Sequence, residues 1–215
     1  NIGAGDEVIT TSLTAFATIL AIIRSGATPV LADIDPDTAL LSLESVKRCL
    51  TRKTKAVILV HIYGQVRCLD EWTDFCNQKE ISLIEDCAQA HTAKWREKIA
   101  GSFGQAGAYS FYPTKNLGAA GDAGMLVTQS TILAKKASNL RNYGQSERYL
   151  HSEIGLNSRL DEIHAAILSE RIKWLPKFTE RRCKIADAYH SKIENPLVKH
   201  LARPEEKSAH VYHLF

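Results

Sequence analysis

Three ionisable residues follow stretches of the sequence that have the composition of buried β-strands. His61 comes after AVILV, Asp86 ends ISLIED, and Lys115 lies between AYSFYP and the glycine-rich run NLGAAGDAG. A lysine amine can bond covalently to a carbonyl carbon, and a carboxylate can hold a heterocyclic nitrogen in its protonated form. Because glycine lets the backbone bend and approach a ligand closely, the setting of Lys115 differs from that of an ordinary surface lysine.

Strands and helices are predicted to alternate over the first 86 residues. The predicted strands cover residues 6–11, 27–34, 55–64 and 81–86, and the predicted helices cover residues 14–26, 43–50 and 69–79. Such alternation implies right-handed crossovers between parallel strands, so we predict an α/β fold with a mostly parallel sheet flanked by helices. Ligands bind beyond the carboxyl ends of the strands in such sheets. The acid and the amine are therefore expected at neighbouring strand ends.

The second half of the chain has a different character. Two short strands, 106–113 and 123–128, flank the Lys115 loop, and the sequence does not decide whether they pair with each other. A helix is expected over 130–144 and a long helical region over 158–193, interrupted only at Pro176. We predict a large α/β domain over 1–175, followed by a helical linker and the start of a smaller domain over 176–215.

Composition disfavours several classes of protein. The net charge is +3, and the basic residues are scattered apart from ERRCK at 180–184, so nucleic acid is not an expected partner. The longest apolar run, AFATILAII, is too short to span a membrane, and no signal peptide is recognisable. The five cysteines are dispersed without zinc-ligand spacing, which is typical of reduced thiols in a cytoplasmic protein.

Signatures of other ligand sites are missing from the sequence. GSFGQAG lacks the dinucleotide-binding spacing, and there is no P-loop lysine pattern. His61 and Asp86 alone are a weak case for a metal, so no metal site is predicted. Pyridoxal phosphate needs a lysine and an acidic partner for its ring nitrogen, so it fits Lys115 and Asp86, although many α/β proteins share this spacing.

The residues that surround Asp86 and Lys115 favour one of these kinds of ligand site. IEDCAQAH, followed by GSFGQAGAYSFYPTKNLGAAGDAGMLVT, closely resembles the DegT/DnrJ/EryC1/StrS family of sugar aminotransferases. The resemblance continues in GDEVITTSLTAFATILAIIRSGATPVLADIDPDT, in GLNSRLDEIHAAIL and in HVYHLF, so it covers essentially the whole chain. It implies the three-layer large domain of fold-type-I enzymes that depend on pyridoxal phosphate.

The resemblance assigns a role to five residues. Lys115 matches the lysine that forms the Schiff base with pyridoxal phosphate, and Asp86 matches the partner of the pyridine nitrogen. Gln89 matches the glutamine near the phenolic oxygen of the ring, and Ser110 matches a ligand of the phosphate. Asn157, in GLNSR, matches an asparagine that reaches a phosphate in the neighbouring subunit, which implies a homodimer with shared active sites.

Ordinary structural roles remain open for some of these residues. Asp86 could cap a helix beginning at CAQA, Ser110 could be a strand hydroxyl, and Asn157 could be a turn residue. Two histidines, His61 and His91, are expected to be hydrogen-bonded locally rather than to act in catalysis. Tyr63 and Tyr112 are expected to be packing aromatics.

The sequence departs from the family pattern at several positions. Ala15 stands where an aromatic residue often stacks on the cofactor ring, with Phe16 one residue later, so the stacking partner is undefined. Thr92 and Ala123 stand where glycine is usual, and either could crowd a tight backbone. The family's N-terminal segment, including a Gly-Thr pair at a helix start that binds phosphate, and most of its small domain have no counterpart, so the chain is expected to be truncated at both ends.

The resemblance implies transfer of an amino group from an amino-acid donor, with L-glutamate expected, to a nucleotide-linked keto-sugar. GLNSRLDEIHAAIL and the following Arg pair favour a 3-keto-6-deoxyhexose. Two alternatives remain. One is a sugar dehydratase of the same family, which has histidine in place of the lysine. The other is a non-catalytic or degenerate fragment that binds the cofactor.

Overall fold

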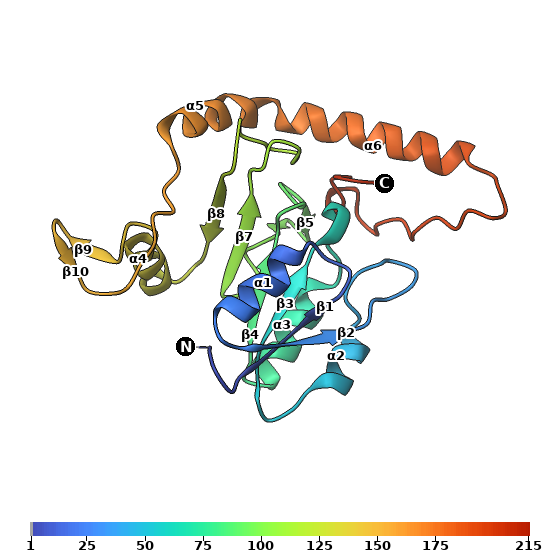
Figure 1. The fold of residues 1–215 in the computed structure, drawn as a ribbon. Helices are drawn as coiled ribbons and strands as arrows, with labels where there is room; N and C mark the ends of the chain where they lie inside the picture. The colour runs from blue at the N-terminus through green and yellow to red at the C-terminus, as the bar shows by residue number, and fades with distance from the viewer. Residues whose placement is uncertain (1) are drawn as a thin grey trace.

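The computed structural model describes residues 2–215, and its centre is a six-stranded sheet (Figure 1). The strands are β1 (Glu7–Thr11), β2 (Thr28–Ala32), β3 (Thr54–Val60), β4 (Ser82–Asp86), β7 (Ala106–Ser110) and β8 (Gly124–Val127). Their order is β2-β1-β3-β4-β7-β8, and neighbouring strands are parallel except for β7 and β8. The prediction of a mostly parallel sheet is therefore confirmed, and the two strands that flank the Lys115 loop do pair with each other.

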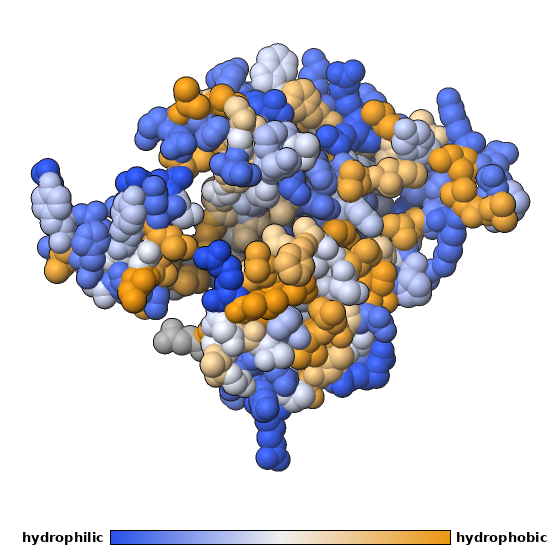
Figure 2. All heavy atoms as spheres, in the orientation of Figure 1, coloured by the Kyte–Doolittle hydropathy of each residue, from blue (hydrophilic) through white to orange (hydrophobic). Residues whose placement is uncertain are grey.

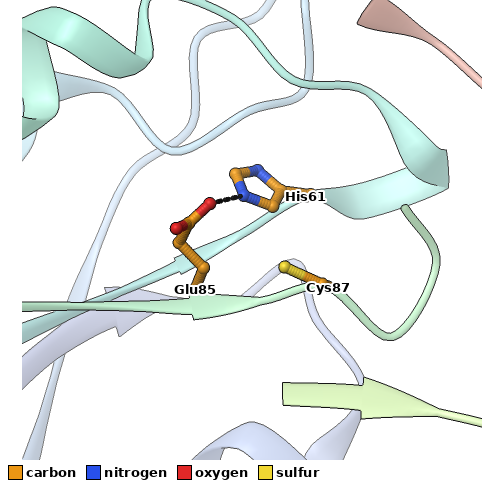
Figure 3. Close-up of side chains that lie close together, drawn as sticks. All are labelled: His61, Glu85 and Cys87. Atoms are coloured by element: carbon orange, nitrogen blue, oxygen red, sulfur yellow. Dashed lines mark hydrogen bonds and ion pairs between the residues drawn. The ribbon is translucent and has the colours of Figure 1, made fainter. Parts of the chain in front are cut away.

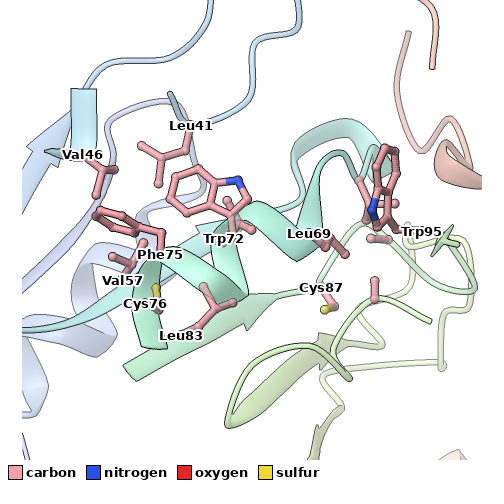
Figure 4. Close-up of a cluster of buried hydrophobic side chains, with 14 of the residues drawn as sticks. Leu41, Val46, Val57, Leu69, Trp72, Phe75, Cys76, Leu83, Cys87 and Trp95 are labelled. Atoms are coloured by element: carbon pink, nitrogen blue, oxygen red, sulfur yellow. The ribbon is translucent and has the colours of Figure 1, made fainter. Parts of the chain in front are cut away.

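Helices cover both faces of the sheet. Successive strand residues point to opposite sides, so the strands contribute to two separate apolar cores. The core beneath α1 (Phe16–Arg24) contains the side chains of Val8, Ile22, Ala27 and Ala56. The larger core on the other face includes Ile9, Val46, Val57, Leu69, Trp72, Phe75 and Leu83, with α2 (Leu43–Cys49) and α3 (Leu69–Gln78) covering it (Figure 4). The result is a three-layer arrangement.

Local sequence sets the ends of these helices. The Ser42 hydroxyl accepts a hydrogen bond from the Ser45 N–H at 3.3 Å, which caps α2. Gly26, two residues after α1, has a φ of 86°, a conformation that glycine adopts without strain. Ser42 thus marks where α2 begins, and Gly26 marks where the connection from α1 to β2 begins.

The carboxyl-terminal helices cross one end of the sheet (Figure 1). They are α5 (Glu162–Arg171), a 3-10 turn at Ile172–Trp174, and α6 (Leu175–Lys192). Leu168 and Leu175 pack with Phe111 and Leu117 in a third core. The long helical region thus begins at 162 rather than 158, and Pro176 lies in the first turn of α6, where proline is tolerated.

The sequence did not predict two short hairpins. β5 (Lys94–Trp95) pairs with β6 (Lys98–Ile99), and β9 (Gln145–Glu147) pairs with β10 (Leu150–His151). The second hairpin and α4 (Thr131–Leu140) form an arm that extends away from the sheet (Figure 1). Between residues 2 and 215, no helix is both long and apolar enough to cross a membrane.

A buried carboxylate holds the segment that follows β6 against the end of β4. Glu85 is fully buried, and its oxygens accept hydrogen bonds from the N–H groups of Gly101 (2.7 Å), Phe103 (2.8 Å) and Gly104 (2.9 Å). The same carboxylate lies 2.9 Å from Nε2 of buried His61 (Figure 3). Burial alone would raise the pKa of Glu85, but the hydrogen bonds from His61 and the backbone outweigh it and lower that pKa below 4.5.

We predict that Glu85→Gln lowers the free energy of unfolding by about 3 kcal/mol, because it removes the charge that several buried donors share. Urea denaturation at pH 7 measures this change, and Glu194→Gln, on the exposed surface, is the control. In the parent chain, the stabilisation by Glu85 is present above about pH 4.5 and is lost as pH falls through the lowered pKa. Equal stability of the two variants would contradict this role for Glu85.

Candidate functional site

The carboxyl ends of β3, β4 and β7 lie at the same edge of the sheet. In the parallel registers, Asp86 is opposite Val60 of β3 on one side and Ala108 of β7 on the other. The His61 N–H donates to the Asp86 carbonyl at 3.1 Å, which extends the pairing by one residue. The loop with Lys115 leaves β7 at this edge, so the structure brings the acid and the amine together, as expected.

The Asp86 carboxylate accepts one protein hydrogen bond on each oxygen. Oδ1 accepts from the Ala88 N–H at 3.1 Å, and Oδ2 accepts from the Thr18 hydroxyl at 2.6 Å. The residues after Asp86 form turns rather than a helix, so Asp86 is not a helix N-cap. A carboxylate oxygen can accept two hydrogen bonds, so the group retains capacity for another donor.

Lys115 is half-buried, and its amine lies close enough to Asp86 to be affected by the negative charge of that carboxylate. Burial lowers the pKa of Lys115 below its ordinary value, and the negative charge of Asp86 acts in the opposite direction. A lowered pKa increases the fraction of neutral amine, which is the nucleophilic form. The lysine therefore has the surroundings that covalent chemistry with a carbonyl requires.

The chain braces the Lys115 loop from two directions. Gly118 lies so close to the loop's own backbone that an added Cβ would be 2.5 Å from the Pro113 carbonyl oxygen. Asn116 donates from Nδ2 to the Val211 carbonyl at 3.1 Å, and its Oδ1 accepts from Nδ1 of His213 at 3.0 Å. Sequence analysis missed Asn116 and His213, because they are 97 residues apart and only the fold brings them together.

Gln89 is oriented by the backbone of a neighbouring turn. Its Oε1 accepts from the Tyr63 N–H at 2.6 Å, which leaves the Nε2 group free to donate elsewhere. Tyr63 has a φ of 59°, an unusual conformation for a residue other than glycine. The sequence treated Tyr63 as a packing residue, whereas its backbone also positions the glutamine.

Ser110 and Asn157 have different surroundings. Ser110, the last residue of β7, is half-buried, and its Oγ accepts from the Tyr112 N–H at 3.2 Å, so its own proton remains available. Asn157 is exposed and forms an isolated bridge with Asn142 at the base of the arm. The fold thus places Ser110 near the Lys115 loop and Asn157 on a separate surface.

The two histidines singled out in the sequence differ. His61 is hydrogen-bonded to Glu85, as expected for a structural histidine. In the part of the chain that the structure describes, neither ring nitrogen of His91 has a hydrogen-bond partner, which contradicts the expectation for that residue. The His91 ring instead lies against Tyr109 and Phe111, with ring centroids 5.4 and 5.8 Å apart.

An apolar groove of about 580 Å³ begins at His91. It runs between β7, β8 and α5, and its lining includes Tyr109, Phe111, Leu160 and Leu168. None of the five site residues expected from the sequence lines this groove. This groove therefore does not coincide with the site predicted from the sequence.

Among residues 2–215, one cluster has the composition of a metal site. His61, Glu85 and Cys87 have ligand atoms within 4.8 Å of one another. However, both oxygens of Glu85 already accept backbone hydrogen bonds, and Nε2 of His61 is bonded to the same carboxylate. Burial raises the pKa of the Cys87 thiol well above its ordinary value, so the sulfur stays protonated. These contacts make the cluster structural.

The departures from the family pattern have different consequences. Thr92 has a φ of 67°, so a β-branched side chain occupies a conformation that favours glycine, as expected for a crowded backbone. Ala123 is not among the residues of positive φ. Phe16, next to Ala15, is 68% exposed and belongs to an apolar surface over α1 that includes Leu20 and Ile23 (Figure 2).

Comparison with known proteins identifies the family. The model of the DegT/DnrJ/EryC1/StrS aminotransferase family matches residues 1–215, so the chain belongs to this family. The resemblance inferred from the lysine segment is confirmed.

Similar proteins include a dTDP-3-amino-3,6-dideoxy-alpha-D-galactopyranose transaminase from Aneurinibacillus thermoaerophilus. It is 44% identical over 215 residues, which cover 100% of this chain and 59% of the relative. A protein named pleiotropic regulatory protein from Geobacillus stearothermophilus is also 44% identical, over 100% of this chain and 58% of the relative. The chain thus spans less than two thirds of the length of these relatives.

Solved structures of sugar aminotransferases share the fold. The S. venezuelae DesV structure, in complex with a ketimine intermediate, superposes with a TM-score of 0.90 and 38% identity. The superposition covers 100% of this chain and 58% of DesV. The three-layer, fold-type-I architecture inferred from the sequence is therefore confirmed.

The burial of His91 leads to a prediction about how the stability of the fold depends on pH. Burial lowers the pKa of His91 from 6.5 to about 4, so the unfolded chain binds more protons than the folded chain between these pH values. Stability is therefore complete above pH 6.5 and falls as pH decreases to 4, by up to about 3 kcal/mol for this group. Burial also lowers the pKa values of His210 and His213 to about 4, so both residues contribute to the same fall in stability below pH 6.5.

Urea denaturation of the parent chain and His91→Phe at four pH values from 4 to 7 measures this effect. We expect the variant to lose about a third of the slope of the unfolding free energy against pH, because His210 and His213 remain. His151→Phe, on the exposed arm, is the control and should keep the parent slope. Identical slopes for His91→Phe and the parent would contradict the prediction.

Proposed function

We propose that this chain is the catalytic large domain of an aminotransferase that uses pyridoxal phosphate to transfer an amino group to a nucleotide-linked keto-sugar. The observation that carries the proposal is the half-buried Lys115 amine beside the Asp86 carboxylate, at the edge where parallel strands end. The expected donor is L-glutamate.

The residues at this edge fit the groups of pyridoxal phosphate. Asp86 retains acceptor capacity for the pyridinium N–H, and the free Nε2 of Gln89 suits the phenolic oxygen. The Ser110 hydroxyl, whose proton is available, suits a phosphate oxygen. When bound, the cofactor would supply an electron sink. Lys115 would condense with its aldehyde with loss of water, and, once the amine of the donor had displaced it, the freed Lys115 amine would move a proton as general base and general acid.

The nature of the sugar is supported by the relatives. The Aneurinibacillus thermoaerophilus relative is named for an amino group at position 3 of a 3,6-dideoxy sugar linked to dTDP. This agrees with the preference for a 3-keto-6-deoxyhexose that the sequence indicated. Lys115 occupies the position at which the dehydratases of the family carry histidine, so the transaminase is favoured over the dehydratase.

A homodimer with shared sites is part of the proposal. Asn157 is exposed at the base of the arm, where it is available to a second subunit. The apolar surface formed by Phe16, Leu20 and Ile23 is the kind of patch that subunit contacts cover. A cytoplasmic location agrees with the five free cysteines.

The division into two domains is also retained as a proposal. The 3-10 turn at Ile172–Trp174 separates α5 from α6, which supports a boundary near residue 175. The second part, 176–215, would link the large domain to a smaller one.

A second candidate function is a cofactor-binding module without catalysis. The name of the Geobacillus stearothermophilus relative, a pleiotropic regulatory protein, favours it. Binding of pyridoxal phosphate without turnover of any amino donor would support this candidate over the transaminase.

We predict that borohydride reduction in the presence of pyridoxal phosphate leaves a reduced adduct on Lys115, because its amine is the one held beside Asp86. Peptide mass mapping locates the adduct. Lys115→Ala should abolish it with little change in the unfolding midpoint, while Lys135→Ala, on α4 of the arm, should retain it. The experiment is done on the chain and on a version extended to the length of its relatives, and no adduct on either would refute the proposal.

We also predict that Asp86→Asn keeps the adduct but slows proton abstraction from the amino donor severely, by about 100-fold or more. A neutral side chain no longer holds the ring nitrogen protonated, so the electron sink is weaker. Single-turnover absorbance kinetics with L-glutamate measure the effect. Half-transamination at the parent rate would remove Asp86 from this role.

A further inference from the structure

Two threonines form a chain of hydroxyl groups that ends on Asp86. The Thr18 Oγ1 lies 2.6 Å from Oδ2 of Asp86, and the Thr14 Oγ1 lies 2.9 Å from the Thr18 Oγ1. Thr18 is 5% exposed, in the first turn of α1, and Thr14 precedes that helix. The sequence shows a signal for this pair in TAFAT, where two hydroxyl residues are four positions apart at a helix start.

The charge on Asp86 fixes the direction of both hydrogen bonds. An ionised carboxylate can only accept, so the single hydroxyl proton of Thr18 must point to Asp86. The Thr18 oxygen is then free to accept, and Thr14 must donate to it. Both hydroxyl dipoles therefore point their positive ends toward the carboxylate, and hydrogen bonds in such chains strengthen one another.

The N-terminus of α1 also lies beside this chain of hydroxyl groups. The N-cap residue Ala15 has no side-chain hydrogen bond, and the first turn of α1 contains no acidic residue. The N-terminus of a helix carries a partial positive charge. Asp86 is on β4, but its carboxylate accepts a hydrogen bond from Thr18 in this first turn. This carboxylate is therefore the negative group that complements the partial positive charge at the N-terminus of α1.

We propose that Thr18, with Thr14 behind it, is the positioning residue that holds the Asp86 carboxylate oriented toward the ring nitrogen of pyridoxal phosphate. The proposal rests on the proposed function, because Asp86 has this role only if the cofactor binds. The Ala88 N–H donates to Oδ1, the other oxygen of Asp86, so both oxygens are held in place. The lone pairs that can still accept a hydrogen bond therefore point in a defined direction.

The test uses pyridoxal phosphate labelled with ¹⁵N in the ring and the form of the protein that gives the Lys115 adduct. The ¹⁵N chemical shift reports whether the ring nitrogen is protonated, and fluorescence titration gives the dissociation constant. We expect Thr18→Val to move the signal toward the unprotonated form and to weaken binding about tenfold, as loss of one charge-assisted hydrogen bond does. Thr14→Val should act in the same direction with a smaller effect.

Two further variants separate positioning from general destabilisation. Thr18→Ser restores the hydroxyl and should bring both values close to those of the parent. Thr10→Val is the matched control, because Thr10 is also buried and its hydroxyl donates to the Ile58 carbonyl at 2.9 Å, away from Asp86. It should leave the ¹⁵N signal unchanged.

Each outcome bears on the proposal. Parent-like signals in Thr18→Val, or the same change in Thr10→Val, would overturn the role of Thr18 while leaving the proposed function intact. Failure of the parent to form the Lys115 adduct would overturn the proposed function, and the positioning role with it.

Discussion

The alternation of side chains at the end of β4 determines the organisation of this domain. Glu85 and Asp86 are adjacent, so they must point to opposite faces of the sheet. Glu85 faces the side of the larger core and binds the backbone at Gly101–Gly104, and Asp86 faces α1 and bonds to Thr18. One carboxylate thus supports the structure while its neighbour remains available for chemistry, and a shift of one residue in the register of β4 would exchange their roles.

Much of the fold could be predicted because its elements carry strong local signals. The amphipathic segment at 69–79 corresponds to α3, and Ser42 and Gly26 mark helix ends by their own chemistry. The apolar run at 55–64 corresponds to β3 only as far as Val60, because Ile62–Gly64 form a 3-10 turn. The Lys115 segment was informative for a different reason. Gly118 is required by the tight loop itself, because an added Cβ would lie 2.5 Å from the Pro113 carbonyl oxygen.

Other features depend on contacts that no local pattern encodes. The antiparallel pairing of β7 and β8 follows from the path of the loop between them, and the brace between Asn116 and His213 joins distant segments. His91 was expected to be hydrogen-bonded because polar groups usually are, yet its ring is enclosed by aromatic side chains. Thr18 escaped notice because a threonine in an apolar helix is read as a packing residue until the strand beneath it is known.

The position of β8 has a practical consequence. Among the strands of the described chain, β8 is last in the order, so one side of its backbone has no strand beside it. Met125 and Leu126 are 45% and 48% exposed there. An open apolar edge of this kind is a template onto which another chain can add a strand. The β8 edge is thus one of two open edges of the sheet, the other being β2, where Leu31 is 53% exposed. Both edges are sites at which aggregation at high protein concentration can begin, and Leu126→Lys would block the one at β8.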